Sequence, residues 1–184
     1  PRNSFSFQLY SEFFKDSYFM RVFWRTLVNS FFVTLICAVL GLPVSYVISG
    51  VSKKWKGILI ALTLFPLLTN SVIRSFAWIT ILGKNGVINS LLLQWGIIKE
   101  PITLLYTDFS IIIGSVYLFL PTMVMTLIGV LENIDDDILE AASTLGLSPI
   151  KIFLKIIFPL SLPGMLVGSV LVFTGTLTAY TTPQ

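Results

Sequence analysis

The stretch LENIDDDILEAASTLGLSPIKIFLKIIFPLSLPG, residues 131–164, carries more charges than any other connection in an otherwise apolar chain. Asn133 is the expected N-cap of a first helix. Three aspartates, Asp135 to Asp137, follow in the first turn, where the helix dipole favours negative charge. Apolar residues then recur at three- and four-residue spacing and predict one apolar face, made of Ile138, Leu139, Ala142 and Leu145.

A second short helix is predicted to follow the first. Gly146 stands where a helix commonly ends with a left-handed residue, and Ser148-Pro149 is typical of an N-cap followed by proline at the first helical position. Pro159 and Pro163 are expected to interrupt this second helix at the membrane entry, because proline removes a backbone donor and clashes with the preceding turn. The stretch therefore predicts a helix pair outside the bilayer.

The charge of the first helix separates two interpretations of this pair. Amphipathic helices that rest on lipid headgroups are usually rich in Lys and Arg. The first helix instead carries four acids and no base, and the acids are Asp135, Asp136, Asp137 and Glu140. Anionic headgroups would repel such a helix, so its apolar face is better explained as a plug for a protein groove.

Composition places the rest of the chain in the membrane class. Of 184 residues, 55% are hydrophobic and only 11% charged, and the mean hydropathy is +0.89. The net charge of +3 comes from scattered Lys and Arg, so nucleic acid is not an expected partner. The chain has no histidine, and no metal site is expected.

Four apolar intervals are each long enough for the roughly 20 residues that a transmembrane helix needs. They predict an all-α integral membrane fold, since an unpaired backbone cannot be left in lipid. The expected helices are 26–49, 58–82, 109–130 and 164–180. The connection 84–108 contains an uncharged segment, 85–98, that is too short to span and predicts a short helix at the membrane surface.

Lys and Arg counts leave the orientation of these helices undecided. The connections 51–56 and 132–155 hold five basic residues, whereas the lead-in 1–25 and the connection 84–108 hold six. The short turn with Lys53, Lys54 and Lys56 favours its own side as cytoplasmic only weakly.

Fixed spacing in the charged stretch resembles the EAA motif of ABC importer permeases, E-A-A-x3-G-x9-I-x-L-P. Every fixed position matches except the leucine, which is Phe158 here. The resemblance implies that 132–158 is a cytoplasmic loop that couples the permease to an ATPase subunit, and that 51–56 lies on the same side. The coupling residues it implies are Glu140, Ala141, Ala142, Gly146, Pro149, Ile156 and Pro159.

Further stretches resemble the permeases of spermidine/putrescine importers within that family, among them TNSVIR at 69–74 and PLSLPG at 159–164. The resemblance covers nearly the whole chain and implies a type I ABC importer transmembrane domain, of which 1–184 would hold four of about six helices. It implies residence in the bacterial inner membrane, with a second permease subunit, ABC ATPase subunits and an extracytoplasmic substrate-binding protein as partners. The 184 residues contain no phosphate-binding loop, so ATP and Mg are expected on the ATPase partner, and no enzyme activity or bound cofactor is expected here.

Five residues are candidates for the cargo path or its gate: Arg74, Trp78, Asp108, Tyr117 and Tyr180. Arg74 is the only charge within a predicted span, which marks a functional hypothesis. It lies close enough to the outer edge to reach the surface instead, with Asp108 as a candidate partner. The three aromatic residues could stack on a cation, although packing or interfacial anchoring is the more common role.

Alternatives remain open for both the transported cargo and the transport mechanism. Polyamine import rests on the resemblance, and the same architecture serves opines, phosphonates and metal ions in related permeases. A channel or secondary transporter would work without an ATPase and would predict internal repeats, which the sequence does not show. A purely structural membrane subunit would tolerate Glu140→Lys.

Overall fold

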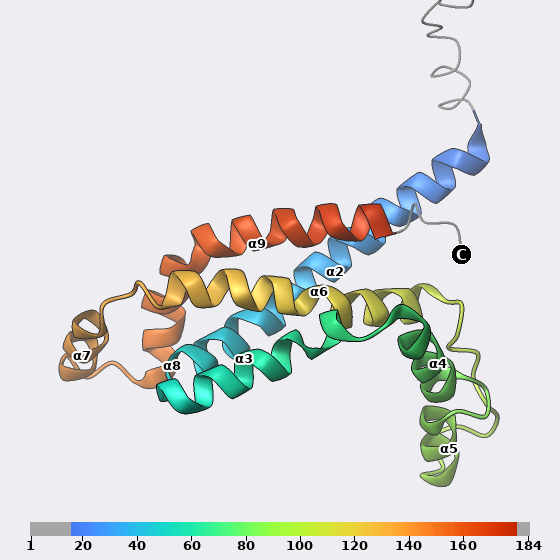
Figure 1. The fold of residues 1–184 in the computed structure, drawn as a ribbon, viewed down its shortest axis with the longest axis horizontal. Coiled ribbons are helices and arrows are strands. Elements are labelled where there is room, and N and C mark those ends of the chain that lie inside the picture. The colour runs from blue at the N-terminus through green and yellow to red at the C-terminus, as the bar shows by residue number, and fades with distance from the viewer. Residues whose placement is uncertain (1–15, 180–184) are drawn as a thin grey trace, which may run out of the picture.

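The computed structural model describes residues 16–179, and all regular elements in this part of the chain are helices, with no strand. Three long helices form a bundle: α2 (Ser17–Ser49), α6 (Asp108–Leu131) and α9 (Phe158–Ala179), with α6 packed against both others (Figure 1). The all-α expectation is confirmed. The predicted start of the first helix at residue 26 is wrong, since α2 begins nine residues earlier, where the Asp16 carboxylate accepts from the backbone N–H of Tyr18.

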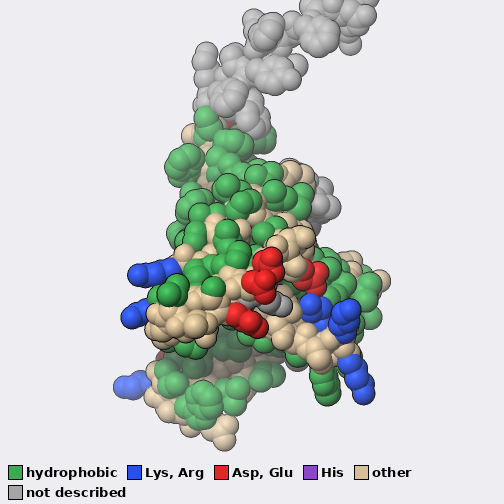
Figure 2. All heavy atoms as spheres, turned by 90° about the vertical axis from the view of Figure 1, so that its left-hand side faces the viewer, with side chains coloured by type: hydrophobic (Ala, Val, Ile, Leu, Met, Phe, Trp, Pro, Cys, Tyr) green, Lys and Arg blue, Asp and Glu red, His purple; other side chains and the backbone are tan. Residues whose placement is uncertain are grey.

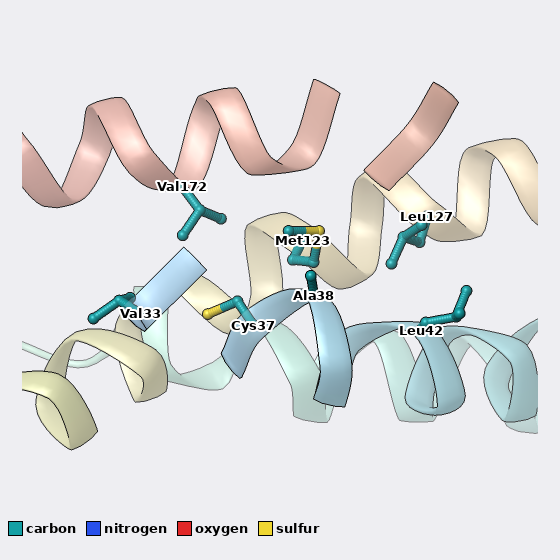
Figure 3. Close-up of a cluster of buried hydrophobic side chains, with 7 residues drawn as sticks. All are labelled: Val33, Cys37, Ala38, Leu42, Met123, Leu127 and Val172. Carbon is teal, nitrogen blue, oxygen red and sulfur yellow. The ribbon is translucent and has the colours of Figure 1, made fainter. Parts of the chain in front are cut away.

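The bundle core is a cluster of buried apolar side chains shared by the three helices. Figure 3 shows them converging, with Met123 of α6 near the centre; the others are Val33, Cys37, Ala38 and Leu42 of α2, Leu127 of α6 and Val172 of α9. Glycines allow this close approach. A Cβ added at Gly41 would lie 2.7 Å from Met123 Cγ, and one added at Gly168 would lie 2.6 Å from Met123 Sδ.

The predicted helix 58–82 is wrong as a single element, because the structure has two helices there. These are α3 (Lys53–Leu68) and α4 (Ser71–Leu82), separated at Thr69 and Asn70. Both polar side chains bond to nearby backbone: Thr69 Oγ1 donates to the Phe65 carbonyl and Asn70 Oδ1 accepts from the Val72 N–H. Such bonds compete with helix continuation, so the run breaks despite its hydrophobicity.

Beyond α4 the chain leaves the bundle. The short helix α5 (Val87–Gln94) confirms the helix expected within 85–98, and α4 and α5 project together from one end of the bundle (Figure 1). Asn89 of α5 is fully buried. Its amide donates to the Gly83 and Ile102 carbonyls and accepts from the Ile102 N–H, so it holds α5 to the returning chain.

The expected interruption at Pro159 and Pro163 is wrong, because both prolines lie inside α9. Helix α8 (Pro149–Ile152) runs into α9 through a π-helical turn, Phe153–Ile157, in which the Phe158 N–H bonds to the Phe153 carbonyl. This wider turn makes room at the point where the proline ring would collide with the carbonyl four residues earlier. Figure 1 shows the helical ribbon changing direction between α8 and α9 instead of ending.

Four helical segments of the described chain are long and apolar enough to cross a membrane: Ser17–Ser49, Ser71–Gln94, Asp108–Leu131 and Pro149–Ala179. The first, third and fourth contain the predicted spans up to residue 179. The second replaces 58–82 and includes a turn between α4 and α5. Helix α3, with 16 residues and a length of about 24 Å, is shorter than the roughly 20 residues that a transmembrane helix needs.

Candidate functional site

The charged stretch folds into a compact helical loop with its own small core. Helix α7 (Asp136–Thr144) packs against α8. The core of the loop is a cluster of four buried apolar side chains, Leu131, Ala142, Ile152 and Ile157. Leu139 and Ile156 pack partly against this cluster. The loop therefore holds a defined shape at the end of the bundle.

Helix capping departs from the sequence prediction at one residue. Asp135, not Asn133, is the N-cap of α7. Asn133 instead donates its amide to the Gly129 carbonyl, which satisfies an acceptor in the last turn of α6. The predicted caps further along are confirmed: Gly146 has φ +80° and Pro149 is the first residue of α8 after Ser148.

The EAA residues divide into a buried and an exposed group. Ala142 is only 5% exposed, whereas Glu140 and Ala141 face solvent. Nothing lies within 4 Å of a Cβ added at Gly146, so glycine is required there by backbone conformation and not by crowding. Pro159 is exposed on α9. The motif thus combines residues that build the loop with residues that the loop presents.

The predicted single apolar face of α7 is only partly used. Leu139 and Ala142 pack inward, but Ile138 is exposed and Leu145 is 83% exposed. Ile150 of α8 is 72% exposed. Figure 2 looks onto this end of the molecule and shows acidic side chains gathered near its middle with lysines or arginines toward the edges. The exposed acids of the loop are Glu132, Asp135, Asp137 and Glu140.

Two connections meet at this end of the bundle. Lys56, in the first turn of α3, forms an ion pair with Glu132 at the end of α6, with 2.9 Å between Nζ and Oε1. The turn 51–56 and the loop 132–158 therefore lie on one side of the fold. Helices α4 and α5 lie toward the other end (Figure 1).

The described candidate path residues lie in two places: Arg74, Trp78 and Tyr117 around α4, and Asp108 at the start of α6. Trp78 of α4 and Tyr117 of α6 are in contact, edge to face, with ring centroids 5.8 Å apart and an interplanar angle of 88°. Arg74 donates from Nη1 to the Pro66 carbonyl at 3.5 Å. Tyr180 lies outside the described residues.

Asp108 does not pair with Arg74 as expected. It accepts hydrogen bonds from Arg25 Nε at 2.5 Å and from Asn29 Nδ2 at 2.9 Å, both on α2. The reason is topological. Helices α2 and α6 are neighbours in the bundle, so the first residue of α6 meets the third and fourth turns of α2, while the break after α3 carries α4 away.

Comparison with known proteins agrees with this architecture. Residues 9–184 match the family described as the binding-protein-dependent transport system inner membrane component. The chain belongs to this family. Its four helical segments that are long and apolar enough to cross a membrane agree with a multi-pass inner-membrane component.

Several curated relatives of this permease segment are transport-system permeases. It is 37% identical over 163 residues to the spermidine/putrescine transport system permease protein PotB of Haemophilus influenzae, covering 89% of this chain and 57% of the relative. Identity to PotB of Escherichia coli is 38% over 157 residues, covering 85% and 57%. It is 28% identical over 151 residues, covering 82% and 65%, to the molybdenum transport system permease protein ModB of Azotobacter vinelandii. The chain thus spans little more than half the length of the PotB relatives.

Sequence reasoning missed three polar contacts of this permease segment. They are the bonds of Arg25 and Asn29 to Asp108, the Lys56–Glu132 ion pair, and the buried Asn89. The first two join residues more than 70 positions apart, so no local pattern announces them. Asn89 carries a weak signal, because an amide between apolar neighbours in a short helix needs buried partners.

Proposed function

We propose that this chain is part of the membrane-spanning subunit of an ATP-driven importer, and that the loop 132–158 docks on a cytoplasmic ATPase subunit. The observation that carries the proposal is the division within the loop. Its own small core fixes α7 against α8 while Glu140, Ile138 and Leu145 remain exposed. A helix held by its own core, with apolar and acidic side chains on its outer surface, suits a protein groove.

Movement of this loop would be transmitted directly to the bundle. Helix α8 continues through the π-helical turn into α9 without a flexible linker, and Leu131 at the end of α6 belongs to the core of the loop. When the ATPase subunits close on ATP and Mg, displacement of α7 would therefore tilt α6 and α9 together. ATP hydrolysis belongs to that partner, and this chain supplies the path.

The experiment compares two matched charge reversals in the full-length permease assembled with its ATPase, second permease and binding protein. Glu140→Lys places a cation on the proposed docking surface, while Glu100→Lys makes the same change on an exposed residue of the 84–108 connection at the other end. We expect Glu140→Lys to lower ATP-dependent uptake at least tenfold, roughly 1.4 kcal/mol of coupling, and to reduce co-purification of the ATPase. Normal uptake by Glu140→Lys would refute the docking role.

The proposed cargo is a polyamine such as spermidine or putrescine. Support comes from the two PotB relatives, whose identity of 37% and 38% exceeds the 28% of ModB. Within the described chain, an aromatic pair, Trp78 and Tyr117, also offers the surface that organic cations prefer. Because the relative ModB belongs to a molybdenum transport system, an oxyanion of molybdenum is the alternative cargo to exclude.

Calorimetry on the cognate extracytoplasmic binding protein decides between these cargoes. Titration with putrescine, spermidine and molybdate should give a saturable heat for the polyamines and none for molybdate. Tight molybdate binding without polyamine binding would overturn the cargo while leaving the docking role of the loop intact.

A further inference from the structure

The break between α3 and α4 exposes the carbonyl end of α3. The last four carbonyls of a helix have no donor within it. Here Thr69 Oγ1 donates to the Phe65 carbonyl at 3.0 Å and Arg74 Nη1 to the Pro66 carbonyl at 3.5 Å. No residue of the described chain donates to the carbonyls of Leu67 or Leu68. This end also carries the negative pole of the helix dipole, so it attracts cations.

The guanidinium of Arg74 already places a positive charge at this end of α3. It is the only charged residue between 57 and 83, and its side chain is half-buried. The 3.5 Å bond is long beside the usual 2.9–3.0 Å. A guanidinium held by a single long bond can be displaced by a stronger donor.

An aromatic pair lies on the same side of α4. Arg74 and Trp78 are four residues apart in α4 and so share a face. Trp78 meets Tyr117 of α6 edge to face. Carbonyl oxygens and aromatic rings are both neutral groups that bind organic ammonium ions. The Arg74 side chain reaches one such carbonyl, and Trp78 lies one helical turn further along the same face of α4.

The position of the carbonyl end of α3 along the bundle suits an entrance to the cargo path. Helix α3 starts beside the Lys56–Glu132 pair, and its 16 residues carry its carbonyl end about 24 Å from that side. Figure 1 shows α4 turning away from the bundle at this point. The site therefore lies toward the end opposite the loop 132–158.

We propose that the carbonyl end of α3 is a binding subsite for a primary ammonium group of the cargo, and that Arg74 is a tethered cation that occupies it until cargo arrives. The proposal rests on the proposed function for its cationic cargo. An ammonium group has three donors and no acceptor, which suits the carbonyls of Pro66, Leu67 and Leu68. Two cations repel at short range, so cargo and guanidinium exclude each other and Arg74 acts as a gate.

The test uses the full-length permease in its complete transporter, reconstituted in vesicles. Arg74→Gln removes the charge and keeps hydrogen-bond donors, whereas Arg74→Lys keeps the charge. We expect Arg74→Gln to lower the KM for putrescine about tenfold and Arg74→Lys to stay within about twofold of the unaltered protein. A second readout is entry of methylammonium without ATP, which should rise in Arg74→Gln only.

Each other outcome overturns the proposal. An unchanged or raised KM in an assembled Arg74→Gln transporter, with no methylammonium entry, means that the guanidinium guards no cation site. If Arg74→Gln fails to assemble, the cation is a fixed structural part that cargo cannot displace. If the unaltered transporter takes up no putrescine, the proposed cargo is wrong. The gating role of Arg74 is then still tested by whether Arg74→Gln admits methylammonium without ATP.

Discussion

Lys56 at the start of α3 and Glu132 at the end of α6 lie 76 residues apart and form an ion pair of 2.9 Å. Both side chains keep contact with solvent, so the pair contributes at most about 1 kcal/mol. Its value is topological. It shows that the lysine-rich turn and the EAA loop lie at one end of the fold, so that a single side of the membrane must hold both.

This shared end predicts the accessibility of three surface positions. In a Cys37→Ala background, Lys54→Cys and Thr144→Cys should react with a membrane-impermeant maleimide only after the cells are permeabilised, and Glu100→Cys should react in intact cells. All three positions are exposed, while the native Cys37 is buried. Labelling of Lys54→Cys and Glu100→Cys from the same side would contradict the orientation.

Much of the architecture follows from the sequence because charge-free intervals and caps are local signals. The positive φ of Gly146 and the start of α8 at Pro149 were both predicted from single residues. The break at Thr69 and Asn70 was not predicted. A hydropathy average over the long apolar run hides these two polar residues, whose side-chain bonds to the backbone turn the chain. At Pro159 the error is the reverse: an interruption was predicted, but the helix continues, because a π-helical turn relieves the clash that proline would cause in a regular helix.

The two alanines of the EAA motif predict different consequences. Ala142→Leu should unfold the loop, since Ala142 is buried against Leu131 and Ile152 and an overpacked site costs about 1–3 kcal/mol. Ala141→Leu changes an exposed neighbour on the same helix and should leave the loop folded. Limited proteolysis of the purified transporter should cut the loop faster in Ala142→Leu only. Equal protection of both variants would mean that Ala142 does not fill a core.

Packing between α6 and α9 predicts a sharp contrast between two glycines. A Cβ added at Gly164 would lie 2.7 Å from Val130 Cγ2, and the β-branched valine has little freedom to move away. Gly164→Ala should therefore destabilise the bundle by about 1–3 kcal/mol. At Gly129 of α6 nothing lies within 4 Å, so Gly129→Ala should be neutral or slightly stabilising. Thermal unfolding of the purified transporter measures both, and equal midpoints would argue against this helix contact.

The buried amide of Asn89 predicts where the 84–107 segment would loosen. Asn89→Leu keeps the apolar character of α5 but leaves the Ile102 carbonyl and the Ile102 N–H without their partner, whereas the Gly83 carbonyl still accepts from the Gly86 N–H. Each buried polar group left unpaired costs about 1–3 kcal/mol. Hydrogen exchange should therefore accelerate across this segment and stay unchanged in the core of α2 and α6. Asn85→Leu, at an exposed position two residues before α5, is the control and should alter neither region. Unchanged exchange at Ile102 in Asn89→Leu would show that apolar packing alone holds α5 to the returning chain.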